Sequence, residues 1–270
     1  MMKMKTATSP GKTNYLNLVR AIGITDFKAK YNNSVLGYFW SLGKPLLLFL
    51  ILYIVFYKFL KFGGGIPNFP VYLLVGIVFW SFFAETTLTA MYSVVSKGGL
   101  IRKVYFPREI IVISASLTSL LTFLLNVVVV FGFIFVLRIP LHANIVLIVP
   151  LIAELYIFTL GVSFILSAMF VKYRDIGHIW EVALQGLFYA TPVIYVITMI
   201  PEKFRGLLML NPAAQIIQDV RYIMVTNKTT VAYQILPGAM WVLPYLIVIG
   251  LVIGGVIYFR SAAASFAEDI

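Results

Sequence analysis

The sequence predicts an all-α polytopic membrane protein with six transmembrane helices. Apolar residues make up 61% of its 270 residues. Charged residues make up only 11%, against roughly a quarter in soluble domains. The apolar residues gather into separate runs of about 20, which is the length that an α-helix needs to cross a bilayer.

Residues 1–34 are predicted to form a cytoplasmic arm with an amphipathic helix. Tyr15, Leu18, Val19 and Ile22 share one face of this helix, and basic residues lie nearby. This pattern is typical of a helix in the plane of the membrane interface. The face could bind lipid or dock a cytoplasmic partner. The arm has no apolar core followed by a small-residue cleavage site, so we expect the first span to direct membrane insertion.

Residues 35–270 are predicted to form a single permease domain that contains the six spans. Lys and Arg concentrate in the arm and in the loop after the second span, which predicts that both termini are cytoplasmic. The net charge of +11 then follows from topology and anionic lipid, so no nucleic-acid partner is expected. The spans are predicted near Val35–Leu60, Pro70–Tyr92, Ile110–Leu137, Ile145–Val171, Ile179–Ile200 and Met240–Phe259.

The loop Ser93–Glu109 is predicted to carry a short cytoplasmic helix. Gly98 and Gly99 break the preceding span, and Pro107 ends the segment. A simple positively charged loop would need the basic residues but not the small apolar face found among them, so we expect a contact with a partner. The apolar residues are Leu100, Ile101, Val104 and Tyr105, interspersed with Arg102, Lys103 and Arg108.

The segment Tyr173–Tyr222 is predicted to contain broken helices. Pro192 interrupts an apolar run, the polar patch Pro201–Arg205 follows, and two apolar pieces too short to cross a bilayer come next. Lipid does not tolerate unpaired backbone, so such pieces must be buried in protein or line a water-filled cavity. We therefore expect re-entrant half-helices between spans five and six of a protein that moves a substrate.

Several residues within the spans allow two interpretations. Glu85 and Glu154 could serve transport, or helix packing and subunit contacts. Gly250 and Gly254 form a GxxxG motif that permits close helix packing. Some aromatic residues could face a lumen or belong to the belts at the membrane interfaces. These are Tyr38, Phe39, Trp40, Phe188, Tyr189 and Tyr195.

No pattern of residues indicates an enzyme. The sequence has no cysteine, no histidine pair at metal-ligand spacing and no Ser/His/Asp arrangement. The stretch Pro10–Thr13 imitates the end of a phosphate-binding loop but has neither the leading glycine nor a preceding strand. We expect no catalytic residue, metal or cofactor site in this chain.

Five motifs in order resemble the membrane permease subunits of polysaccharide ABC exporters. The resemblance covers nearly the whole chain, and it is to the O-antigen, teichoic acid and capsule exporters, the O-antigen type in particular. The motifs are Lys30-Tyr31 with Ser34, Leu36-Gly37, Trp40 and Pro45; Phe106-Pro107-Arg108-Glu109; Arg174-Asp175-Ile176; Thr191-Pro192-Val193-Ile194-Tyr195; and Asn211-Pro212.

The resemblance implies a homodimer in the inner (cytoplasmic) membrane, with a channel between the subunits where spans one and five approach. It implies two copies of a separate ATPase subunit, which would bind ATP and Mg²⁺, and a polysaccharide linked to polyprenyl diphosphate as the substrate. The residues 100–108 would form the coupling helix, and Asn211 and Pro212 would belong to a re-entrant gate. Lys28, Lys30 and Tyr31 would lie where the substrate enters, although the two lysines could equally be positive-inside anchors. The six aromatic residues named above would line the channel.

Three alternatives remain open at this stage. An ABC exporter of a drug or lipid shares much of this architecture, although the motif near Lys30–Pro45 and the lack of a large extracellular domain favour a glycan. Asn211-Pro212-Ala213 matches the aquaporin tripeptide, but a second copy after span two is missing, which disfavours a passive pore. A scaffold that transports nothing would leave the broken helices unexplained.

Overall fold

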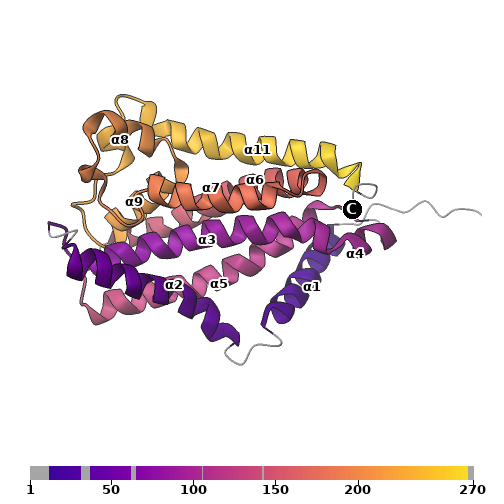
Figure 1. Ribbon diagram of the computed structural model, residues 1–270, viewed down its shortest axis with the longest axis horizontal. Helices are drawn as coiled ribbons and strands as arrows, with labels where there is room; N and C mark the ends of the chain where they lie inside the picture. Colours follow the sequence, from indigo (N-terminus) through magenta and orange to yellow (C-terminus); the bar gives the residue numbers. More distant parts are fainter. Residues whose placement is uncertain (1–11, 32–36, 62–64, 105, 142, 267–270) are drawn as a thin grey trace, which may run out of the picture.

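The structure is a computed structural model that describes residues 12–31, 37–61, 65–104, 106–141 and 143–266. These residues form helices and connecting segments, without a β-strand among them. The long helices lie side by side along the longest axis of the molecule (Figure 1). Helices α1 and α4 and the C-terminus lie at one end, and α8 and α9 lie at the other.

The helices follow one another in this order. The N-terminal half contains α1 (Lys12–Tyr31), α2 (Gly37–Leu52), the π-helix η1 (Tyr53–Phe59), α3 (Phe69–Ser96), α4 (Gly98–Lys103) and α5 (Glu109–Val136). The C-terminal half contains η2 (Ala143–Leu147), α6 (Ile148–Lys172), α7 (Ile176–Ala190), η3 (Ile197–Met199), α8 (Glu202–Met209), α9 (Pro212–Met224), α10 (Ala232–Ile235), η4 (Met240–Val242) and α11 (Leu243–Ala263).

Five helical segments of the described chain are long and apolar enough to cross a membrane, and the predicted fifth span is not among them. That span was predicted near Ile179–Ile200 with an interruption at Pro192, and α7 ends at Ala190 after fifteen residues. Pro192 explains the break, because proline has no N–H to donate and disfavours helix in the residue before it. The five segments are Trp40–Phe59, Phe69–Ser96, Glu109–Val136, Ala143–Lys172 and Met240–Ala263.

Helix α3 lies at the centre of the bundle. It packs against α5 and α6. In the most apolar 18-residue stretch of α3, 78% of the residues are buried, whereas only 11% are buried in the corresponding stretch of Trp40–Phe59. The remaining candidate spans each keep an exposed apolar face, as a lipid-facing helix would.

The contact between α6 and α11 depends on a glycine that the GxxxG motif did not indicate. A Cβ at Gly255 would lie 2.5 Å from the carbonyl oxygen of Gly161, so the two backbones touch. A Cβ at either glycine of the predicted pair, Gly250 or Gly254, would have no neighbouring helix within 4 Å. Small residues allow close approach of two helices. The rotation of α11 about its own axis places Gly255, and not Gly254, against α6.

The apolar face of α1 is covered by protein. Val19 is buried, and Tyr15, Leu18 and Ile22 pack against the same cluster of buried side chains. The main neighbour of α1 is α5. The apolar face that was predicted to bind lipid or a partner therefore packs against other helices of the same chain.

The short helix in the loop Ser93–Glu109 differs from its predicted form. Helix α4 begins at Gly98 and has only six residues, so the glycines open the helix instead of preceding it. Its apolar residues divide: Ile101 is buried and joins the core, while Leu100 and Val104 are 38% and 53% exposed. A small exposed apolar patch remains. Tyr105 lies outside the described residues.

Candidate functional site

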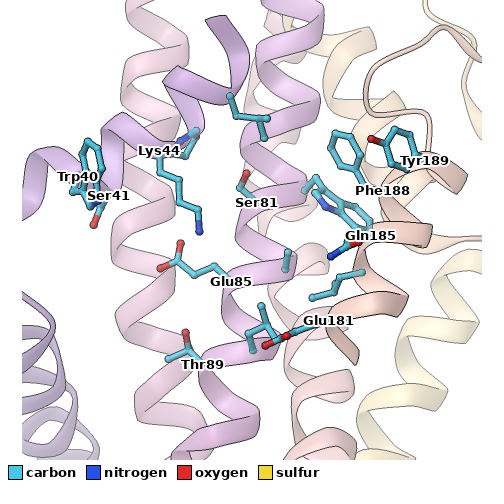
Figure 2. A pocket seen from close by; sticks show the side chains of 16 residues that line it. Trp40, Ser41, Lys44, Ser81, Glu85, Thr89, Glu181, Gln185, Phe188 and Tyr189 are labelled. Atoms are coloured by element: carbon cyan, nitrogen blue, oxygen red, sulfur yellow. The ribbon is translucent and has the colours of Figure 1, made fainter. Parts of the chain in front are cut away.

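A cavity of about 910 Å³ lies between α2, α3 and α7. Helix α2 and helix α7 flank it, and α3 forms its back wall (Figure 2). The cavity is lined by Trp40, Ser41, Lys44, Pro45, Leu48, Trp80, Ser81, Ala84, Glu85, Leu88, Thr89, Glu181, Leu184, Gln185, Phe188 and Tyr189.

Polar side chains form a row on each of two walls of this cavity. Residues four apart share a helix face, and α3 contributes one such row at positions 81, 85 and 89. Helix α7 contributes another at 181, 185 and 189 (Figure 2). Eight residues of helix rise by about 12 Å. The cavity therefore offers a polar track of that length. We call the two rows the α3 row (Ser81, Glu85 and Thr89) and the α7 row (Glu181, Gln185 and Tyr189).

Aromatic rings border the same track. Trp80 is almost fully buried and meets Phe188 edge-on, with ring centroids 6.0 Å apart. Phe188 in turn meets Tyr189 at 5.3 Å. Tyr189 and Trp40 are 65% and 58% exposed. Exposed rings beside acceptors of hydrogen bonds suit a ligand with both C–H faces and hydroxyl groups.

Three charged side chains line the cavity, and two of them are acidic. Figure 2 shows Lys44 on α2 pointing toward Glu85 on α3. Glu181 lies on α7 and accepts a long hydrogen bond of 3.4 Å from the hydroxyl of Tyr92. Within the described chain, the cavity walls therefore carry more negative than positive charge.

A buried arginine holds the break that ends α7. Arg221 on α9 is fully buried and donates to the carbonyl oxygens of Pro192 and Val193, both at 2.5 Å. It also donates to the carbonyl oxygen of Tyr72 on α3 at 2.9 Å, and its guanidinium lies 3.7 Å from the centroid of the Tyr72 ring. Gly76 leaves room for it, because a Cβ there would collide with the guanidinium. The broken backbone is thus satisfied inside the protein.

Asn211 fixes the start of α9 to the same break. Its Oδ1 accepts from the backbone N–H of Ala213 at 3.0 Å, and its Nδ2 donates to the hydroxyl oxygen of Thr191 at 3.1 Å. Pro212 occupies the first turn, where its missing N–H costs nothing. The Asn-Pro-Ala tripeptide therefore acts as a helix cap in this chain.

The two short helices differ in their surroundings. Helix α9 is buried along most of its length and contacts α3 and α6, as the argument from unpaired backbone requires. Helix α8 is mostly exposed, and the predicted polar patch forms its first turn. Only α9 is enclosed by protein.

The opposite end of the bundle carries the basic residues of the α4 region. Lys97, just before α4, forms an ion pair with Asp26 of α1. Arg260 of α11 donates to Glu109 at the start of α5, at 2.8 Å. These pairs join the first helix and the last long helix to the segment that surrounds α4.

The structure brings together only part of the residues predicted to line a channel. Trp40, Phe188 and Tyr189 line the cavity. Tyr195 does not, because its hydroxyl donates to the carbonyl oxygen of Tyr189 at 3.0 Å beyond the end of α7. Lys28 is exposed on α1, and Glu85 joins the cavity wall. Four other predicted residues lie in helices, but their side chains are outside the described part: Lys30, Tyr31, Tyr38 and Phe39.

Sequence reasoning missed Glu181 and Gln185 of the α7 row and the buried arginine. The spacing 181, 185, 189 was a usable signal, because polar residues every fourth position in an apolar segment mark one face. Glu154 proved to lie elsewhere, near Asp219 and Gln215 on α9. The role of Arg221 had no local signal, since Tyr72 is 149 positions away.

Comparison with known proteins gave one family. The family model for ABC-2 type transporters matches residues 17–225, which include α2, α3, α7 and α9. Three curated relatives carry the name "O-antigen export system permease protein RfbA". Two from Klebsiella pneumoniae are 34% and 32% identical over 218 residues, covering 80% of this chain and 83% of each relative. One from Myxococcus xanthus is 28% identical over 219 residues, covering 79% of this chain and 82% of the relative.

Proposed function

Because the chain belongs to the ABC-2 type transporter family, we propose that it is the membrane permease of an exporter for an O-antigen-like polysaccharide. The substrate would be a glycan linked to polyprenyl diphosphate, moved across the inner membrane with both termini of the permease in the cytoplasm. The names of the curated relatives support a glycan over a drug or a lipid. Membership of the ABC-2 type transporter family favours an exporter over an aquaporin-like pore.

The observation that carries this proposal is the track between α2, α3 and α7. A glycan presents apolar C–H faces and many hydroxyl groups, and the track offers both aromatic rings and hydrogen-bonding side chains. The track extends for about 12 Å along the helix axes.

A second copy of the chain would complete the channel. Ile179, Val182 and Tyr189 leave much of α7 uncovered within one chain, at 61%, 68% and 65% exposure. In a homodimer with two-fold symmetry the same faces of both subunits would meet. The cavity of each subunit would then form half of a lumen, next to α2 and α7.

A separate ATPase would drive the transport. Two copies would bind the cytoplasmic face and hold ATP and Mg²⁺, and the exposed Leu100 and Val104 of the α4 region would seat in a groove of each. Closure of the ATPase would press on this region, and the ion pair between Lys97 and Asp26 would pass the movement to α1. The two bundles would then separate and widen the lumen. Helices α8 and α9 would close its outer end as a gate.

Basic residues near the cytoplasmic mouth would attract the diphosphate. Lys28 is exposed on α1, and Lys30 follows two positions later. We expect that neutralising Lys28 and Lys30 together reduces glycan export without removing the protein from the membrane. Unchanged surface glycan in that double variant would reject this role.

Gentle purification of the tagged chain from its native membrane tests the proposal as a whole. We expect a stoichiometric ATPase subunit whose hydrolysis rate changes when this chain is removed. A complex of this chain alone, without a nucleotide-binding partner, would contradict the proposal.

A further inference from the structure

The α7 wall of the cavity carries a carboxylate without a matching cation in the described part of the chain. Glu85 on the α3 wall faces Lys44 (Figure 2). Glu181 on the α7 wall has the Tyr92 hydroxyl as its neighbour, and the described ion pairs do not include it. Glu181 lies one helical turn from Gln185, and both line the track. The negative charge is thus placed on the wall that would face a second subunit.

This arrangement favours the binding of uncharged sugars and disfavours the binding of acidic sugars. A carboxylate only accepts hydrogen bonds, and the hydroxyl groups of an uncharged sugar can donate to it. The carboxylate of a uronic acid, or a phosphate substituent, cannot donate in its ionised form and repels Glu181 instead. A cleft with low-dielectric walls concentrates such fields, so the repulsion is stronger there than in open water.

We propose that Glu181 is a specificity-determining residue that makes the track accept uncharged glycans and disfavour glycans with acidic repeats. This inference rests on the proposed function of the cavity. The diphosphate of the lipid carrier passes once for each polymer, whereas an acidic polymer presents a charge at every repeat. Selection by Glu181 therefore acts on the polymer and not on its carrier.

The composition of the exported glycan is the first test. The gene for this chain is deleted, and the surface glycan that disappears is purified from the parent cells and analysed for uronic acids and phosphate. We expect an uncharged glycan. A glycan that disappears but has an acidic group in each repeat would overturn the charge selection alone. Loss of no glycan at all would instead contradict the proposed function.

Binding of a matched pair of probes is the second test. The first probe is the purified glycan itself, and the second is the same glycan after oxidation of its primary alcohols to carboxylates. Both are titrated into the purified complex, and tryptophan fluorescence is followed because Trp40 and Trp80 line the cavity. The variants are Glu181→Gln and, as a control with the same charge change outside the cavity, Glu202→Gln on α8. The carboxylate of Glu202 is 89% exposed.

We expect the wild type to bind the uncharged probe more tightly. Glu181→Gln should reduce this preference on the order of threefold, as expected for one partly exposed charge, and Glu202→Gln should leave it unchanged. The preference should also shrink at high salt. A preference that persists in Glu181→Gln, or equal binding of both probes to the wild type, would overturn the inference. No binding of either probe would contradict the role of the cavity itself.

Discussion

Replacement of Arg221 by methionine tests the structural account of the broken helix. Methionine keeps an unbranched apolar side chain beside Tyr72 but removes every donor. The carbonyl oxygens of Pro192 and Val193 lie outside regular helix, and Arg221 is their hydrogen-bond donor in the described chain. Both oxygens would then be buried without a partner.

The expected loss of stability follows from those two carbonyl groups. A buried acceptor without a partner costs about 1–3 kcal/mol. Two such groups predict that Arg221→Met lowers the free energy of unfolding by about 2–6 kcal/mol. The carbonyl oxygen of Tyr72 adds little, because it lies within α3 and can keep its helical partner.

Arg205 provides a matched control. It also donates to two backbone carbonyl oxygens, those of Ile200 at 2.7 Å and Thr198 at 2.9 Å. Its side chain is 24% exposed, so water can replace the lost donors. We expect Arg205→Met to cost less than about 1 kcal/mol.

Unfolding of both variants can be measured by titrating a denaturing detergent into mixed micelles and following circular dichroism. Equal losses for Arg221→Met and Arg205→Met, or a loss below about 1 kcal/mol for Arg221→Met, would refute the reasoning. Gly76→Ala offers an independent probe, because its Cβ would lie 2.6 Å from the carbonyl oxygen of Val193 and crowd the guanidinium. It should destabilise, although alanine normally favours a helix over glycine.

Two further predictions concern the helix crossing and the α4 region. Gly255→Leu should lower stability by about 1–3 kcal/mol, because its Cβ meets the backbone of Gly161, whereas Gly254→Leu at an open position should not; the same detergent titration decides, and equal effects would contradict the contact. Reversing the charge of either Lys97 or Asp26 should reduce surface glycan, and reversing both should restore it. Antibody staining of intact cells measures this, and failure of the double reversal to rescue would argue against the ion pair as a link.

The sequence predicted the parts of the fold that depend on local composition. Apolar length located the five long segments, and Pro192 located the break within a span. The requirement that lipid-exposed backbone be paired led to the short helices, of which α9 is enclosed as expected. Each of these properties depends on about 20 consecutive residues, so it can be predicted from the local sequence.

The features that could not be predicted from the sequence depend on contacts between distant segments. The burial of α1 against α5 could not be distinguished from lipid binding, because both require the same apolar face. The choice of Gly255 over Gly254 depends on the phase of α11 relative to α6. The site was predicted only in part. Its aromatic residues were predicted to line a channel, but Glu181 and Gln185 were interpreted as part of a span and not as a polar row on the cavity wall.

The polar row of α7 has a consequence for how the chain is made. A charged residue at the centre of a lone helix costs about 2.5–3.5 kcal/mol for insertion from the translocon, and α7 has only fifteen residues to offset this. Helix α6 ends at Lys172 and α7 begins at Ile176, so the two helices form a hairpin with a very short turn. The more apolar α6 would then draw α7 into the bilayer during synthesis. The polar side chains that line the cavity would thus make the insertion of α7 depend on a neighbouring helix.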